Sequence, residues 1–162
     1  GVTRSGLDGI DVDVLGGKFN MTDIAAAIGL GQFARLEEFN ARRKFLAQCY
    51  FAAFGADFEA QYGAELPPAD NPETNWHMFQ IVLPERITRP DFMARMLERQ
   101  IGIGYHYAPI HLFTLYRARG FKEGMFPVAE RIGRQIVTLP LFPSMSEQDV
   151  ERVVNEVKSL RR

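Results

Sequence analysis

Residues 22–54 read TDIAAAIGLGQFARLEEFNARRKFLAQCYFAAF and carry the longest helical pattern in the chain. Apolar side chains recur near helical spacing through this range, and charged side chains fill the opposite side. Thr22 is suited to cap the helix at its start. One helix over this range would be about 48 Å long at about 1.5 Å per residue, with Gly29 and Gly31 as possible kinks. A helix of this length on so short a chain needs a second body to pack against.

The segment before this pattern differs from the rest of the chain. The first 17 residues are interrupted by glycines, their aspartates alternate with apolar residues, and they show no period of 3.6. A segment of this kind buries little surface, so we expect an arm or loop over residues 1–21 rather than the start of a domain.

The remainder, residues 55–162, alternates short strand patterns with helical ones. Capping signals at Thr88 and Ser146 begin two of the helices, and a third helix is predicted over 127–135. Strand composition is found in three stretches: His77–Leu83, Ile101–His106 and Ile136–Leu139. This order predicts an α+β fold, with a long helix followed by a small three-stranded sheet packed with helices. The same order also fits many ferredoxin-like modules.

Composition excludes several classes of protein. The chain has 162 residues, 46% of them hydrophobic and 24% charged, which predicts one folded domain and excludes wholesale disorder. Its 19 basic and 20 acidic residues leave a net charge of −1 with no basic tract, so neither nucleic acid nor an anionic membrane is an expected partner. No apolar run reaches the roughly 20 residues of a membrane span. We expect a cytoplasmic protein.

Few residues suggest chemistry on their own. Cys49 is the only cysteine, which excludes an internal disulfide and a zinc site built on paired cysteines, and its apolar neighbours favour an inert thiol. The histidines are His77, His106 and His111, and no carboxylate stands at metal-ligand spacing from them, so no metal site is predicted. The glycines around residue 103 lack the third glycine of a dinucleotide fingerprint.

A more specific pattern stands just before the long helix. Lys18 and Asn20 follow two glycines and, in an extended chain, would project a cation and an amide in the same direction. A helix N-terminus in this setting suits a phosphate. A solvated lysine beside a capping amide explains the same residues, and the pattern alone favours that interpretation.

A series of motifs, in chain order, resembles those of sugar aminotransferases of the DegT/DnrJ/StrS family. The segment GKFNMTDIAAAIGL resembles the entry to that family's long helix, and LEEFNARR resembles the middle of the same helix. The segment GIGYHYAPIHL resembles its substrate-side loop, and FPVAER and LPLFP resemble its closing signatures. The resemblance covers about residues 16–162.

The resemblance implies that this chain is the C-terminal small domain of a fold-type-I aminotransferase that uses pyridoxal phosphate. Residues 1–21 would form an arm or loop that leads out of a large domain. Residues 22–54 would form an interdomain helix, and residues 55–162 would form the small domain. The implied enzyme is a homodimer that moves an amino group from a donor such as glutamate to a nucleotide-linked keto sugar. Amino-sugar synthesis of this kind serves the cell envelope or secondary metabolism.

The resemblance also implies roles for individual residues. The Schiff-base lysine belongs to the large domain, and none of this chain's four lysines has its sequence context, so no catalytic residue is expected here. Asn20 or Lys18 would reach the cofactor phosphate of the neighbouring subunit. His106, Tyr107 and His111 would line the sugar-nucleotide side. His77 would lie near the site or serve the structure.

A function of another class fits the apolar long helix as well. The chain would then be a non-catalytic module that dimerises or binds partners through this helix, with no chemistry of its own. A lysine in a glutamate- and glycine-rich context, encoded upstream of Gly1, would favour the enzyme over the module.

Overall fold

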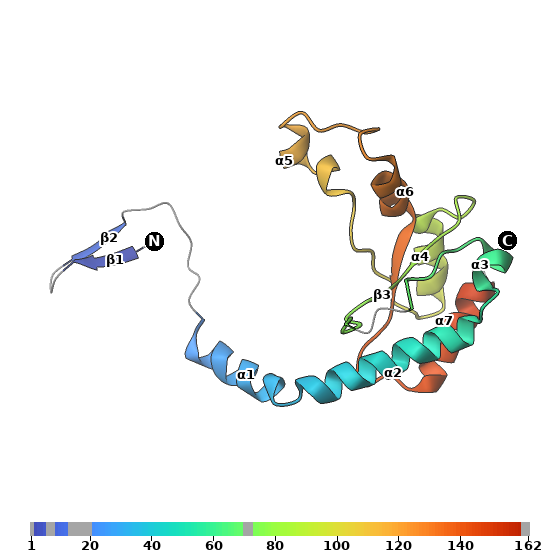
Figure 1. Ribbon diagram of the computed structural model, residues 1–162, viewed down its shortest axis with the longest axis horizontal. Helices are drawn as coiled ribbons and strands as arrows, with labels where there is room; N and C mark the ends of the chain where they lie inside the picture. Colours follow the sequence, from blue (N-terminus) through green and yellow to red (C-terminus); the bar gives the residue numbers. More distant parts are fainter. Residues whose placement is uncertain (1, 6–8, 13–20, 70–72, 160–162) are drawn as a thin grey trace. The chain divides into compact units, whose positions relative to one another are not determined.

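The computed structural model describes residues 2–5, 9–12, 21–69 and 73–159. The chain divides into two compact units, Gly1–Glu37 and Glu38–Arg162 (Figure 1).

The first unit contains a hairpin and a helix. Strands β1 (Val2–Ser5) and β2 (Gly9–Val12) pair antiparallel, with Val2 opposite Val12. Helix α1 (Asp23–Phe33) begins after Thr22, whose hydroxyl accepts a hydrogen bond from the Ala25 amide at 3.2 Å. The sequence predicts an arm or loop over the first 21 residues, and strands β1 and β2 lie within this segment.

The predicted long helix is divided in two. Helix α1 ends at Phe33, and helix α2 (Leu36–Phe54) begins three residues later. The Arg35 amide donates to the Gln32 carbonyl at 3.0 Å, a bond that tightens the last turn of α1. The prediction of one uninterrupted helix is therefore wrong at Ala34 and Arg35. Neither predicted kink, Gly29 or Gly31, is the point of the break.

The second unit is built around a two-stranded sheet. Its elements, in chain order, are α2, α3 (Phe58–Tyr62), β3 (Phe79–Val82), α4 (Arg89–Glu98), the 3₁₀ turn η1 (Ile110–Leu112), α5 (Thr114–Arg117), α6 (Pro127–Gln135), β4 (Ile136–Leu139) and α7 (Glu147–Ser159). Strands β3 and β4 pair antiparallel, with Phe79 opposite Leu139 and Val82 opposite Ile136. The mixture of helices with a small sheet agrees with the predicted α+β class.

The third predicted strand, over Ile101–His106, does not form. This segment contributes one bridge, between Gly104 and Thr138 at the free edge of β4. Glycines at 102 and 104 offer no side chain to pack on a pleated surface and weaken a strand. At Gly104 the backbone is also crowded, because an added Cβ would lie 3.0 Å from Cε1 of His106.

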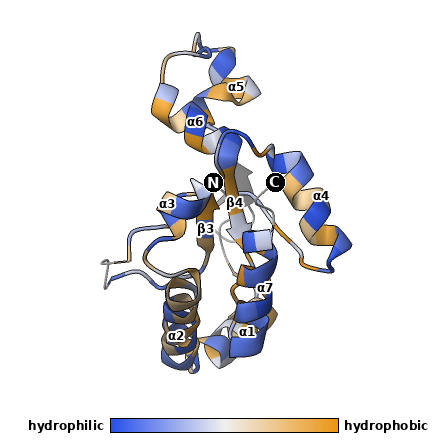
Figure 2. Ribbon diagram, turned by 90° about the vertical axis from the view of Figure 1, so that its right-hand side faces the viewer, coloured by the Kyte–Doolittle hydropathy of each residue, from blue (hydrophilic) through white to orange (hydrophobic). Residues whose placement is uncertain are grey.

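The core of this unit lies between the strands and the helices α2, α4 and α7 (Figure 2). Tyr50 of α2 stacks on Phe79 of β3 with ring centroids 4.6 Å apart, and its buried hydroxyl donates to the Pro140 carbonyl at 2.7 Å. Burial raises the pKa of the Tyr50 phenol. Four valines of α7 are buried on the same core: Val150, Val153, Val154 and Val157.

Both helix caps predicted in this unit are present. Thr88 accepts from the Asp91 amide at the start of α4. Ser146 and Asp149 bond reciprocally at the start of α7, at 2.8 and 3.1 Å. Within the described residues, no helix combines the length and apolar character needed to cross a membrane.

Candidate functional site

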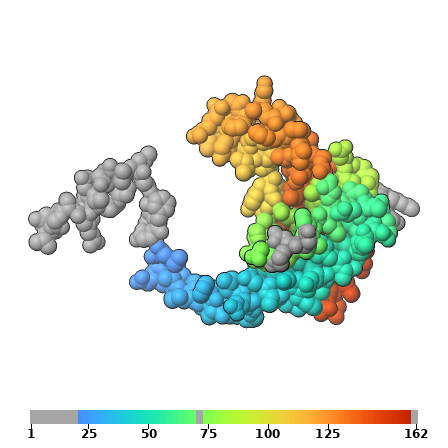
Figure 3. Space-filling view, viewed as in Figure 1, coloured from blue at the N-terminus to red at the C-terminus, as the bar shows by residue number. Residues whose placement is uncertain are grey.

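An open pocket of about 630 Å³ lies at one end of the second unit. The segment from His106 to His111 forms one wall, and α5, α6 and the loop between them form the other. In the space-filling view these yellow and orange segments lie away from α2 (Figure 3). The lining residues are His106, Tyr107, Ala108, Pro109, Ile110, His111, Tyr116, Phe121, Phe126, Ala129, Ile132, Gly133 and Ile136.

His106 is held by the sheet. Its Nδ1 lies 2.9 Å from the hydroxyl of Thr138 on β4, and its carbonyl accepts from the side-chain amide of Gln80 on β3 at 2.6 Å. The imidazole fits closely against Gly104, where any side chain would crowd it. Both strands therefore fix the position of His106 at the pocket.

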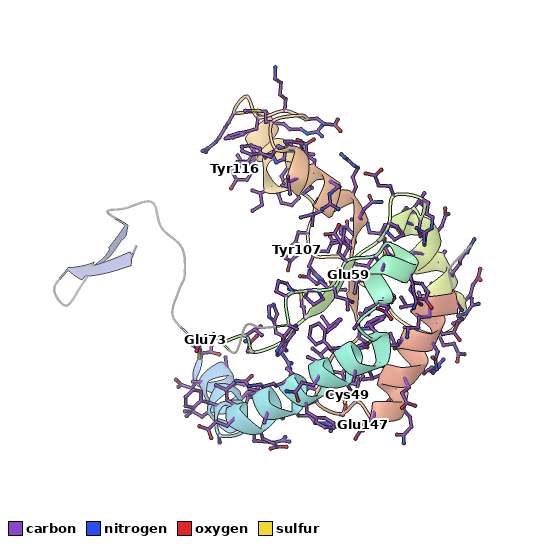
Figure 4. All side chains as sticks on the ribbon, turned by 45° about the vertical axis from the view of Figure 1, so that its right-hand side comes forward. Cys49, Glu59, Glu73, Tyr107, Tyr116 and Glu147 are labelled. Carbon is purple, nitrogen blue, oxygen red and sulfur yellow. The ribbon has the colours of Figure 1, made fainter. Side chains whose placement is uncertain are left out.

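Tyr107 is exposed at the pocket, with 67% of its surface accessible. Its ring meets that of His106 edge to face, with centroids 4.9 Å apart. Tyr107 and Tyr116, which comes from α5, are labelled in Figure 4. Because most of the lining is apolar or aromatic, the two imidazoles and two phenols are the polar side chains that the pocket offers to a ligand.

His111 is buried at the pocket, with 8% of its surface exposed. Its Nε2 lies 2.9 Å from Oε1 of Glu130, whose side chain is also buried. Backbone donation from Gly124, assisted by His111 and Phe126, holds the pKa of the Glu130 carboxyl below its ordinary range despite desolvation. Glu130 therefore stays ionised and faces His111 as an acceptor.

Sequence reasoning did not identify Glu130. The carboxylate returns to the amide of Phe126, the residue that precedes α6, at 3.2 Å. A capping box places its acidic residue three positions after the cap, whereas Glu130 stands four positions after it. The spacing from Phe126 to Glu130 is therefore one residue longer than that of the capping box, the pattern that would have predicted this contact.

His77 does not belong to this pocket. It is exposed, two residues before β3 begins, and its ring lies 3.3 Å from the side-chain oxygen of Asn75. The structure therefore brings together three of the four predicted substrate residues, His106, Tyr107 and His111, and leaves His77 in a surface turn.

The predicted cofactor residues, Lys18 and Asn20, lie outside the described residues. Of the other lysines, Lys44 and Lys122 are exposed, and Lys158 donates to the Ala53 carbonyl at 2.7 Å. The described lining of the pocket contains no lysine and no arginine. Pyridoxal phosphate needs a Schiff-base lysine and donors for its phosphate, so the described residues do not form a site that would hold it.

Metal binding and thiol chemistry have no site among the described residues. Among the described residues, no group of three or more His, Cys, Asp or Glu side chains is gathered as metal ligands would be. Cys49 lies on α2 close to the start of α7 (Figure 4), where burial and then the charge of Glu147 raise the pKa of its thiol. A raised pKa disfavours the thiolate, so Cys49 is not poised as a nucleophile.

The chain is similar to proteins of known family. The profile of the DegT/DnrJ/EryC1/StrS aminotransferase family matches residues 1–158. The chain is 34% identical over 150 residues to the uncharacterized protein MJ1066 of Methanocaldococcus jannaschii, covering 90% of this chain and 38% of that protein. It is 32% identical over 157 residues to the spore coat polysaccharide biosynthesis protein SpsC of Bacillus subtilis, covering 93% and 39%.

A solved structure has the same fold. Spr1654 of Streptococcus pneumoniae, named as a sugar aminotransferase and solved in its PLP form, superposes with a TM-score of 0.81 at 26% identity. The match covers 99% of this chain and 40% of that one. The chain thus spans about two fifths of the length of these relatives. The resemblance drawn from the ordered sequence motifs is confirmed.

Proposed function

The chain belongs to the DegT/DnrJ/EryC1/StrS aminotransferase family, and on this premise we propose that it is the C-terminal part of a pyridoxal-phosphate-dependent sugar aminotransferase. The observation that carries the proposal is the apolar pocket on which His106, Tyr107 and His111 converge. These are the residues that the family resemblance assigns to the sugar-nucleotide side.

The proposed substrate is a nucleotide-linked keto sugar. A sugar offers hydroxyl groups to the imidazoles and phenols of the pocket, and its ring carbons suit the apolar wall. The name of SpsC, which refers to polysaccharide biosynthesis, supports a sugar as the substrate class. The proposed amino donor is glutamate.

In the proposed enzyme this chain binds and orients the sugar. His106 is held by Thr138 and Gln80, so its ring is fixed before the ligand arrives. A hydrogen-bonding side chain that is already fixed loses less conformational entropy when it positions the keto carbon than a mobile side chain does. Pyridoxal phosphate, when bound, supplies the electron sink for amino transfer, and no step at the cofactor is assigned to the described residues.

The cofactor itself would be held mostly outside the described residues. We propose that the Schiff-base lysine lies in a large domain that this chain does not contain, as the positions of Lys44, Lys122 and Lys158 support. Lys18 or Asn20 would contact the cofactor phosphate of the neighbouring subunit of a homodimer. His77 then serves the surface turn.

The same proposal covers the organisation and location of the chain. Residues 1–21 lead out of the large domain, residues 22–54 join the two domains, and residues 55–162 form the small domain. We expect this enzyme in the cytoplasm. The exposed apolar residues of α1 also favour the alternative, a non-catalytic module that dimerises, and the following experiment separates the two functions.

The test compares the 162-residue chain with the whole protein that carries it. Each is incubated with stoichiometric pyridoxal phosphate, reduced with borohydride and mapped by mass spectrometry. We expect the whole protein to carry one reduced adduct on a lysine outside this chain, and the chain alone to carry none. A stoichiometric adduct at Lys18, Lys44, Lys122 or Lys158 would contradict the proposed division of the site. A whole protein without any adduct would favour the non-catalytic module.

A further inference from the structure

One buried carboxylate joins three separate segments beside the pocket. Glu130 of α6 has 4% of its surface exposed. Its Oε1 accepts from His111 at 2.9 Å and from the amides of Gly124 and Phe126 at 2.9 and 3.2 Å, and its Oε2 lies 3.0 Å from the Gly124 amide. The side chain thereby connects α6 with η1 and with the loop that leads from α5 to α6.

The loop joined in this way forms part of the pocket wall. Phe121 and Phe126 line the pocket, and their rings stack with centroids 6.4 Å apart. The ring of His111 meets that of Phe126 at 4.8 Å and an angle of 65°. Gly124 stands at φ +91°, a backbone conformation that favours glycine. A contact to this loop therefore bears directly on the shape of the wall.

The same carboxylate determines which ring nitrogen of His111 carries hydrogen. An ionised carboxylate accepts hydrogen bonds and cannot donate them. Since Oε1 of Glu130 faces Nε2 of His111, the hydrogen must be on Nε2. In the neutral ring, Nδ1 is then the atom left as an acceptor.

We propose that Glu130 is a positioning residue of this pocket, which fixes His111 as the Nε2–H tautomer and holds the Gly124–Phe126 turn as the pocket wall. His111 thereby offers Nδ1 as an acceptor for a hydroxyl group of the ligand. This assignment of the ligand rests on the proposed function, in which the ligand is a sugar. The effect of Glu130 on His111 and on the loop does not depend on it.

The experiment uses NMR on the ¹⁵N-labelled chain and three variants. Long-range ¹H–¹⁵N spectra at pH 9, well above the ordinary histidine pKa of about 6.5, report the tautomer of His111. Hydrogen exchange reports the amides of Gly124 and Phe126. The variants are E130Q, E130A and the matched control E123Q, which removes an exposed carboxylate from the same loop.

The expected results distinguish the effect of the Glu130 carboxylate from that of any other change in the loop. In the unsubstituted chain, His111 is the Nε2–H tautomer, and both amides exchange slowly although their residues are exposed. E130A speeds their exchange by about 10- to 100-fold, the equivalent of a hydrogen bond to a charged group. E130Q, whose amide can donate to Nε2, moves the His111 ring away from the pure Nε2–H tautomer. E123Q changes neither reading.

Two results would overturn the proposal: an unsubstituted chain in which Nε2 of His111 carries no hydrogen, or unchanged amide exchange in both E130 variants. The first result comes from the unsubstituted chain, so it tests the proposal even where E130A fails to fold. In the whole protein, E130Q should raise the KM for the keto sugar about tenfold and leave the half-reaction with the amino donor unchanged. A whole protein without aminotransferase activity would contradict the proposed function alone, because the NMR readings stand without it.

Discussion

The two histidines of the pocket are fixed by partners of different charge. His106 bonds to the neutral hydroxyl of Thr138, and His111 bonds to the ionised carboxylate of Glu130. A hydroxyl can donate or accept, so it leaves the tautomer of His106 open, whereas a carboxylate only accepts. His106 can therefore adopt either tautomer, whereas His111 keeps its hydrogen on Nε2.

Replacement of His106 tests its part in binding. In the whole protein, H106A should raise the KM for the sugar nucleotide about tenfold and leave the half-reaction with the amino donor intact, because a group that only positions substrate contributes uniform binding. Steady-state kinetics of each half-reaction measure this. H77A is the matched control, since His77 lies in an exposed turn and does not line the pocket. An equal loss in both half-reactions would instead assign His106 to the cofactor.

Acid should weaken the contribution of Glu130 to stability. Its pKa is lower in the folded chain than the roughly 4.3 of an unfolded glutamate, so its contribution is complete above that pH and is lost as the pH falls through the folded pKa. Urea unfolding should show E130Q less stable than the unsubstituted chain at pH 7, with a smaller difference at pH 3. E123Q should match the unsubstituted chain at pH 7. A difference for E130Q that is constant with pH would contradict this assignment.

At the scale of elements, local signals predicted what local contacts determine. Residues 127–135 and 136–139 form α6 and β4 with the predicted bounds, since a proline at the helix start and β-branched residues in the strand act locally. The break at Ala34 and Arg35 had no such signal, because both residues favour helix. The predicted strand over Ile101–His106 does not form, because glycines occupy two of its positions and offer no side chain to pack on a sheet.

The same contrast between local and long-range contacts explains which site residues the sequence predicted. His106, Tyr107 and His111 were predicted from a family motif, and they share one short segment, so the motif brought them together. Glu130 is 19 residues from His111 in sequence, and their contact depends on how α6 packs. Spacing along the chain could not reveal that pair.

The packing of α6 depends on a glycine. Gly133 meets the Pro109 ring so closely that an added Cβ would lie 2.5 Å from Cδ and 2.6 Å from Cγ. We expect G133A to cost about 1–3 kcal/mol of unfolding free energy, as overpacking does, and to displace the pocket wall. Urea denaturation measures the cost. G102A is the control, because open space surrounds Gly102 and little change is expected there. Equal stability of G133A and the unsubstituted chain would mean that the Pro109 segment moves freely.

At the scale of the whole molecule, the apolar residues of α1 form an uncovered surface among the described residues. The helix has no buried residue, and Ile24, Ile28, Leu30 and Phe33 are all more than 60% exposed. The C-terminal half of α2, by contrast, is covered by the core, with Leu46, Tyr50 and Phe54 buried. The surplus of apolar surface inferred from the sequence is thus found in α1 and the start of α2.

Exposed apolar surface of this kind should cause association. Burial of each such side chain contributes about 1.5–3 kcal/mol, so we expect the chain to form a two-fold dimer through α1 at micromolar concentration. Light scattering measures the mass. A variant with Ile28 and Phe33 replaced by serine should be monomeric, and L97S, which changes an exposed leucine on α4, is the matched control. A monomer of 18.4 kDa that binds no hydrophobic dye would contradict the expectation.

The contact between α2 and α7 has a consequence for synthesis on the ribosome. Arg42 donates to Met145, and Lys158 donates to Ala53, across separations of 103 and 105 residues. The apolar face of α2 can pack early on Phe79 of β3, but it is fully covered only after the roughly 80 residues between Phe54 and Ile136, and then α7, have been made. At about 5–20 residues per second, the first interval alone lasts about 4–16 s. During that time the apolar face of α2 is only partly covered, so we expect chaperones that act during translation to bind α2.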